Sequence, residues 1–108
     1  MNNINLNDIR VLIKRPNERA EVKRIPNTYN EFERIVGGYP MFNLKIGNTL
    51  CYYFDTQDKS TNNLNFNFYN FPTIYGAVIF TGEDKFGVPC DITFEEISYV
   101  YKLFKGAM

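Results

Sequence analysis

The chain has 108 residues, of which 44% are hydrophobic and 17% aromatic, and this composition indicates one globular domain over 1–108 with a frayed end over 1–7. Twelve basic residues balance twelve acidic ones, which argues against a nucleic-acid-binding domain because such domains are usually basic. Histidine is absent, so Ser–His–Asp and Cys–His catalytic sets and zinc sites built on imidazole are excluded.

The first element is a predicted β-hairpin. Ile9, Val11 and Ile13 alternate with other residues at the period of a strand that has one well-buried face. The segment 16–18 has turn chemistry, because proline fixes φ and short polar residues tolerate tight geometry. The segment 20–25 is then the returning strand.

A short helix is predicted over 28–36. Thr28 and Glu31 have the spacing of a capping box, in which each side chain accepts a hydrogen bond from the other residue's backbone N–H, and Asn27 is a competing cap. Gly37 stands where a helix needs a left-handed residue to end it. The apolar stripe of this helix consists of Phe32, Ile35 and Val36.

A second hairpin joins strands predicted over 42–46 and 50–55, because Gly47-Asn48 between them accepts positive φ. The polar segment 56–63 is expected to be a loop. The segment 65–71 alternates asparagines with aromatic residues, and it fits either a short edge strand or an irregular segment across the core.

The apolar run 74–81 predicts a strand buried on both faces and therefore central in the sheet, with Gly76 marking a bulge or a close backbone approach. The segment 82–91 is expected to be a loop in which Pro89 prevents regular pairing. A second capping box, Thr93 to Glu96, begins the last helix. Its expected apolar stripe consists of Phe94, Ile97, Tyr101 and Phe104, with Val100 alongside.

These elements predict an α+β fold in the order ββαββ(β)βα. Two hairpins and two helices favour a mostly antiparallel sheet of about five strands with both helices on one face. No segment reaches the apolar length of a membrane span, so we expect a cytoplasmic protein without a membrane partner.

Several motifs of chemistry are missing from the sequence. Cys51 and Cys90 are isolated, which excludes a CxxC site and favours reduced thiols, with Cys51 as a small buried residue. The chain contains neither a GxGxxG loop nor a phosphate-binding loop of the GxxxxGK[ST] type. We therefore expect a protein that is not an enzyme and that uses no cofactor and no metal.

Three segments resemble the domain-of-unknown-function family 3846, a set of small proteins of low-GC Gram-positive bacteria, their plasmids and their phages. They are Val36-Gly37-Gly38-Tyr39, the strand 75–80 and the helix start 91–97, and the likeness covers about 9–104. At 63–67, where family members tend to have a stretch with glycine and proline, this chain differs. The resemblance implies a source in mobile elements, whose small proteins often disable host defence components.

Three groups of residues are candidates for binding. Gly37 and Gly38 beside Tyr39 form either an anion-binding nest or a helix C-cap followed by a bend. All five arginines lie within 1–34, as a phosphate grip or as a solvated face with weak ion pairs. Aromatic residues of 52–71 either stack ligands or fill the core. The candidate residues are Arg10, Arg24, Gly37, Gly38, Tyr39, Tyr52, Tyr53, Phe66, Phe68 and Tyr69.

The leading functional hypothesis is a small non-enzymatic binding protein of phage or mobile-element type that inhibits a host defence factor by protein–protein contact. It predicts that exposed aromatic residues of 52–71 form a contiguous patch. The alternative is a sponge or sensor for a small nucleotide-like ligand, which needs arginines of the hairpin beside those aromatic residues or beside the turn at 37–38. A further alternative is a structural domain that forms a homodimer through a strand edge.

Overall fold

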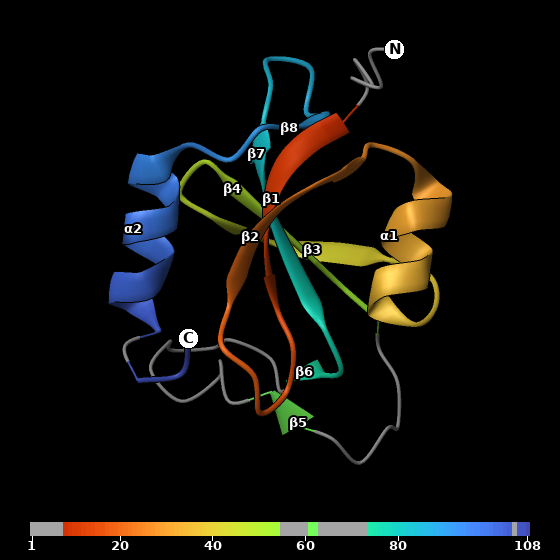
Figure 1. The fold of residues 1–108 in the computed structure, drawn as a ribbon. Helices are drawn as coiled ribbons and strands as arrows, with labels where there is room; N and C mark the ends of the chain where they lie inside the picture. The colour runs from red at the N-terminus through yellow and green to blue at the C-terminus, as the bar shows by residue number, and fades with distance from the viewer. Residues whose placement is uncertain (1–7, 55–60, 63–73, 105) are drawn as a thin grey trace, which may run out of the picture.

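The protein, described by a computed structural model over residues 8–54, 61–62, 74–104 and 106–108, contains a six-stranded sheet between two helices (Figure 1). The order across the sheet is β2-β1-β7-β4-β3, with β8 also paired to β7, and all of these neighbours are antiparallel. The α+β class with a mostly antiparallel sheet is therefore confirmed. The strands are β1 (Asp8–Lys14), β2 (Glu21–Pro26), β3 (Met41–Ile46), β4 (Thr49–Tyr53), β7 (Val78–Glu83) and β8 (Pro89–Cys90).

The helices α1 (Tyr29–Val36) and α2 (Phe94–Leu103) cover opposite faces of the sheet (Figure 1). Successive side chains of a strand point to opposite faces, and on β1 Leu12 packs in the cluster with α2 whereas Val11 packs in the cluster with α1. On β7, Phe80 and Ile79 divide in the same way. The expectation of both helices on one face is therefore wrong, because the central strands carry apolar side chains on both faces.

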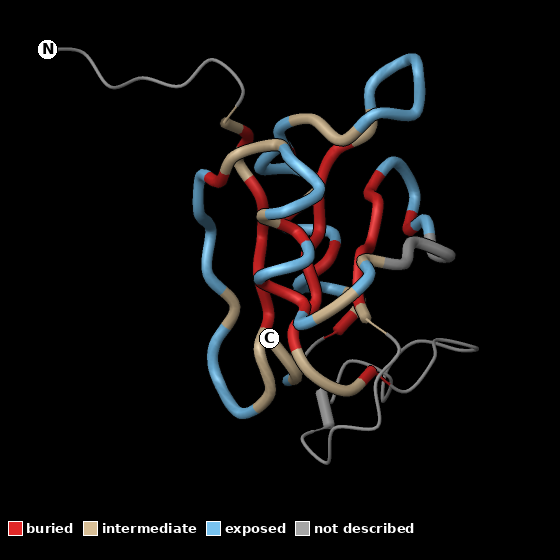
Figure 2. Tube along the Cα trace, turned by 90° about the vertical axis from the view of Figure 1, so that its right-hand side faces the viewer, coloured by how far each residue is buried: buried red, intermediate tan, exposed pale blue. Residues whose placement is uncertain are grey.

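The buried residues form two clusters, one on each side of the sheet, and Figure 2 shows the central strands as buried. The cluster under α2 contains Leu12, Ile46, Cys51, Tyr53, Ile74, Val78, Phe80, Ile92, Ile97, Val100 and Phe104. The cluster under α1 contains Ile9, Val11, Ile13, Ile25, Phe32, Ile35, Val36, Leu50, Tyr52, Ala77 and Ile79. The single buried face expected for the first strand is also wrong, because Leu12 is as fully buried as its neighbours.

Both predicted hairpins are present. β1 pairs with β2 from Asp8 opposite Pro26 to Ile13 opposite Glu21, and the turn between them contains Asn17 at φ 61°. β3 pairs with β4 through a turn that contains Gly47 at φ 61°. The special backbone conformations thus fall on glycine and asparagine, the residues that accept them with least strain.

The apolar run 74–81 is divided into two strands. Gly76 at φ 84° separates β6 (Ile74–Tyr75), which pairs with β5 (Thr61–Asn62), from β7. β7 occupies the predicted central position between β1 and β4. The expected loops at 56–63 and 82–91 are corrected, because they contain β5, the end of β7 and the short strand β8. The predicted segment 65–71 lies outside the described residues.

The helix ends fall where the capping patterns place them, but the predicted capping box of α1 is only half formed, because the Glu31 carboxylate accepts from Arg34. The Thr28 hydroxyl accepts a hydrogen bond from the Glu31 N–H, and Gly37 ends α1 at φ 89°. Thr93 and Glu96 form the reciprocal capping box of α2. The expected stripe of α2 is corrected, because Phe94 and Tyr101 are exposed and the buried stripe is Ile97, Val100 and Phe104. Within the described part of the chain, no helix is long and apolar enough to cross a membrane.

Candidate functional site

Arg10 and Arg24 lie opposite each other on β1 and β2, and both hold the segment that leads into α2. The Arg10 Nε donates to the Ile92 carbonyl at 2.8 Å, and its guanidinium lies 4.6 Å from the centroid of the Phe94 ring. Arg24 donates through Nη2 to the Asp8 carbonyl at 2.8 Å, and its Nη1 lies 3.9 Å from an Asp91 carboxylate oxygen. These contacts support a structural role for both arginines rather than a phosphate grip.

The glycine pair completes the end of α1. The backbone N–H groups of Gly37 and Gly38 both donate to the Glu33 carbonyl, at 2.9 and 3.1 Å. An anion-binding nest needs such N–H groups to point at the ligand, and here they are bonded within the cap. The structural interpretation of this pair, a helix cap, therefore has the support of the geometry.

A polar hollow of about 340 Å³ does bring a hairpin arginine beside this turn. Arg15 lines it together with Gly37, and Glu18 lines it as well. The Arg15 Nη1 also lies 3.8 Å from a carboxylate oxygen of Glu21. The lining of this polar hollow therefore carries both signs of charge, and none of the described residues in it is aromatic.

Tyr52 and Tyr53 fill the core instead of forming an exposed patch, so the expectation of exposure is wrong for this pair. As neighbours in β4, they enter the clusters on opposite faces of the sheet. The Tyr52 ring meets the Phe32 ring edge to face, with centroids 5.0 Å apart. Burial, with the nearby Glu83 carboxylate, raises the pKa of Tyr52 to about 12. The candidates Phe66, Phe68 and Tyr69 lie outside the described residues.

Tyr39 and Tyr52 meet in a hollow of about 340 Å³ at the side of α1, which we call the aromatic hollow. Tyr29 and Tyr39 are 52% and 64% exposed, and their rings meet at 5.9 Å in an edge contact, whereas Phe32 and Tyr52 are buried beneath. The hollow thus has a fixed aromatic floor and two accessible tyrosine rings. Its lining residues are Asn27, Thr28, Tyr29, Phe32, Tyr39, Pro40, Tyr52 and Pro89.

The wall of the aromatic hollow is held by contacts between distant parts of the chain. The Asn27 side-chain N–H donates to the Pro89 carbonyl at 3.0 Å and joins β8 to the start of α1. Sequence reasoning missed Tyr29, Phe32, Pro40 and Pro89 as site residues. The available signal was the spacing of Tyr29, which precedes Phe32 by three positions and Val36 by seven and therefore lies beside the apolar stripe in the first turn of the helix.

The hairpin between β7 and β8 leads into Pro89, which lines the aromatic hollow. The Asp84 carboxylate accepts hydrogen bonds from the N–H groups of Phe86 and Val88, at 2.8 and 2.9 Å. Gly87 has φ 79°, which the tight turn requires. Phe86 and Val88 are both exposed. The turn therefore presents two apolar side chains on an ordered backbone.

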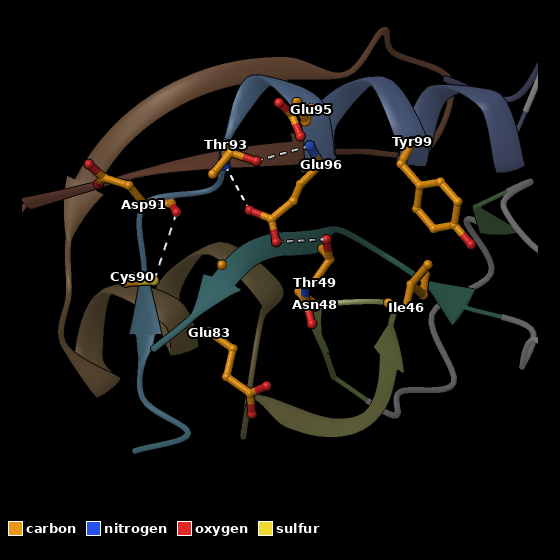
Figure 3. A pocket seen from close by; sticks show the side chains of 12 residues that line it. Ile46, Asn48, Thr49, Glu83, Cys90, Asp91, Thr93, Glu95, Glu96 and Tyr99 are labelled. Atoms are coloured by element: carbon orange, nitrogen blue, oxygen red, sulfur yellow. Dashed lines mark hydrogen bonds between the residues drawn. The ribbon is translucent and has the colours of Figure 1, made fainter. Parts of the chain in front are cut away.

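A third hollow, of about 540 Å³, has an acidic lining that includes Glu83, Asp91, Glu95 and Glu96 (Figure 3). Glu83 forms an ion pair with Lys45 at 2.6 Å, and an Asp91 carboxylate oxygen accepts from the Arg10 N–H at 2.7 Å. Two of these four carboxylates therefore already bond to other parts of the fold.

Glu96 and Cys90 of this acidic hollow are also engaged or weakly reactive. Glu96 accepts from the Thr93 N–H at 2.8 Å and from the Thr49 hydroxyl at 3.5 Å (Figure 3). Burial and the surrounding carboxylates raise the pKa of the Cys90 thiol, which disfavours the nucleophilic thiolate. Among the described residues, no group of three or more Cys, Asp or Glu side chains could hold a metal ion.

Comparison with known proteins gives no match, whether with family models, with curated proteins or with solved structures. The resemblance to the domain-of-unknown-function family 3846 stays a prediction. The function of this chain is therefore inferred from the geometry of the aromatic hollow and of the surfaces around it.

Proposed function

We propose that this chain is a non-enzymatic binding protein that acts by contact with a protein partner at the aromatic hollow. The observation that carries the proposal is the pair of exposed rings, Tyr29 and Tyr39, above a buried floor of Phe32 and Tyr52. Tyrosine is enriched at interface positions that contribute most to affinity, because one ring offers a large apolar area and a polar hydroxyl.

The fixed geometry of the aromatic hollow favours binding of a partner. The Thr28 cap and the Gly37 cap fix both ends of α1, and the bond from Asn27 to Pro89 fixes the facing wall. A tyrosine has few rotatable bonds, so its rings lose little conformational entropy when a partner covers them. The resemblance to mobile-element proteins supports a host protein as that partner, with inhibition of a defence factor as the consequence.

Two tagged double variants test this proposal on lysate from a low-GC Gram-positive host. Tyr29→Ala/Tyr39→Ala removes the exposed rings of the hollow, and Tyr99→Ala/Tyr101→Ala removes two exposed tyrosines of α2 as the control. We expect the partner to be retained by the wild type and the control. The hollow variant should bind about a hundredfold more weakly, if each ring contributes roughly 1.4 kcal/mol. Equal retention by all three proteins would contradict the proposal.

The nucleotide-like ligand is a separate hypothesis with a separate test. Among the described residues, no arginine lines the aromatic hollow, so the stacking surface and a guanidinium do not meet there. A thermal-shift screen against mono-, di- and cyclic nucleotides should therefore give no shift. A nucleotide at about a hundred times its dissociation constant would stabilise the fold by about 2.7 kcal/mol, and such a shift would favour the ligand-binding hypothesis instead.

A further inference from the structure

The aromatic hollow has no positive charge in its described lining. None of the described residues that line it is a lysine or an arginine, and its polar side chains are those of Asn27, threonine and tyrosine. α1 forms one side of the hollow, and its only basic residue is Arg34, whose guanidinium bonds to the Glu31 carboxylate. The described lining therefore supplies no cation to the rings of the hollow.

A carboxylate lies beside the exposed tyrosines of the hollow. Glu33 in α1 is exposed, and one of its oxygens accepts a hydrogen bond from the Tyr29 hydroxyl, 3.4 Å away. The neighbouring Glu31 differs, because Arg34 and Lys23 both favour its ionised form and lower its pKa. Within the described part of the chain, no lysine or arginine forms an ion pair with Glu33. The Glu33 carboxylate therefore adds an uncompensated negative charge beside Tyr29.

The exposed rings also present faces that attract a cation. The planes of the Tyr29 and Tyr39 rings meet at 64°, so the edge of one ring approaches the other ring. In such an edge contact, each ring keeps at least one face that its neighbour does not cover. The face of a tyrosine ring carries the negative part of the ring quadrupole, and it attracts a cation within about 6 Å. Both the rings and the nearby carboxylate therefore complement a positive charge.

Two other exposed rings of the chain already have a cation from the chain itself. The Arg10 guanidinium lies 4.6 Å from the centroid of the Phe94 ring, and the Lys85 ammonium lies 5.1 Å from that of the Phe86 ring. Arg10 also shows what a guanidinium adds, because its Nε donates to a backbone carbonyl while the group lies over the ring. An ammonium is more strongly hydrated and lacks this planar set of donors.

We propose that the aromatic hollow receives an arginine side chain of the partner protein, with its guanidinium over an exposed tyrosine ring and its N–H groups bonded to the Glu33 carboxylate. The partner is the one of the proposed function, on which this inference rests. Arginine fits both features, because a planar guanidinium stacks on an aromatic ring and donates two parallel hydrogen bonds to a carboxylate. Arginine is also enriched among the residues that contribute most to the affinity of protein interfaces.

Nuclear magnetic resonance titration with blocked tripeptides tests the proposal with the side chain alone. The probes are N-acetyl-Gly-Arg-Gly-amide and the same peptide with citrulline, which has nearly the shape of arginine but no charge, or with lysine. We expect the arginine peptide to shift the signals of α1 with a Kd of about 1–10 mM. The citrulline peptide should bind about tenfold more weakly, and the lysine peptide about threefold more weakly.

Matched variants locate the binding. Glu33→Gln still accepts the Tyr29 hydroxyl but has no charge, so it should weaken binding of the arginine peptide about threefold or more and leave the citrulline peptide unchanged. Glu95→Gln removes an exposed carboxylate of α2, on the opposite face of the sheet (Figure 1), and should bind like the wild type. Tyr29→Ala/Tyr39→Ala should abolish the shifts. Circular dichroism melts confirm that each variant is folded.

Equal binding of the arginine and citrulline peptides, tighter binding of the lysine peptide, or no shift with about 50 mM arginine peptide would overturn the proposal. Shifts that persist in Tyr29→Ala/Tyr39→Ala would also overturn it, because the peptide would then bind elsewhere. The lysate experiment separates these results from failure of the proposed function. If the double variant loses the partner but the peptides bind equally, the partner occupies the hollow without an arginine and only this inference fails. If retention does not depend on the two tyrosines, the proposed function itself fails.

Discussion

Two matched valine substitutions test whether the helices pack on separate cores. Val36 in α1 is 4% exposed and Val100 in α2 is 0% exposed, and they belong to different clusters. Replacing either by alanine removes two methyl groups, which costs about 1.6 kcal/mol in transfer free energy plus a cavity term. The better helix propensity of alanine returns about 0.5 kcal/mol, so each variant should lose about 2 kcal/mol of stability.

The double variant Val36→Ala/Val100→Ala distinguishes one core from two. Because the sheet separates the two sites and their clusters share no residue, the two losses should add to within about 0.5 kcal/mol. The expected total of about 4 kcal/mol stays below the usual stability of a domain, so the double variant should fold. If both helices shared one face, the two cavities would be neighbours and their energies would couple.

Urea denaturation followed by far-ultraviolet circular dichroism measures the four free energies of this cycle. Phe80→Leu and Phe104→Leu give the contrasting case, because these two rings lie 6.1 Å apart in the cluster under α2. The phenylalanine pair should show a coupling energy of about 0.5 kcal/mol or more. A coupling for the valine pair as large as that for the phenylalanine pair would refute the arrangement on opposite faces.

Three other experiments have clear expected results. Gly82→Ala should cost about 1–3 kcal/mol, because its new Cβ would collide with the Asp91 carbonyl, and a melting temperature equal to that of the wild type would contradict this. Because the pKa of Tyr52 rises from an ordinary 10.0 to about 12 in the fold, its contribution to stability is complete below pH 10 and is lost as the pH rises to 12. The free energy of unfolding, measured by urea denaturation over this pH range, should therefore fall less for Tyr52→Phe than for the wild type. An equal fall for both proteins would argue against the pKa shift of Tyr52. Burial raises the pKa of Cys51 strongly, so a thiol reagent should label Cys90 alone in the native protein and both cysteines in denaturant. Rapid labelling of Cys51 in the native protein would show that its site is open to the reagent.

The helix ends and turns could be predicted from the sequence because the interactions that make them are local. The Thr28 hydroxyl reaches a backbone N–H three residues away, and the capping box of Thr93 has the same span. Glycine at positions 37 and 47 permits the positive φ angles that the helix end and the tight turn require. Contacts of this kind need no knowledge of the rest of the fold.

The aromatic hollow could be predicted only in part, because it is assembled from segments far apart in the chain. Tyr39 and Tyr52 were candidates, but the facing wall is fixed by Asn27 and Pro89, which are 62 positions apart. The aromatic content of 52–53 was a misleading signal of exposure. β4 lies between β7 and β3 with a packed layer on each face, so both tyrosines are buried.

The apolar pattern of the predicted strands already indicated that the helices lie on opposite faces of the sheet. A strand that is apolar at successive positions, such as the run around Phe80, needs a covering layer on each face. Two helices on one face would leave Leu12, Cys51 and Phe80 without a cover, since all three point away from α1. Because the central strands are buried on both faces, the fold needs a covering layer on each side of the sheet. With two helices, this requires one helix on each side.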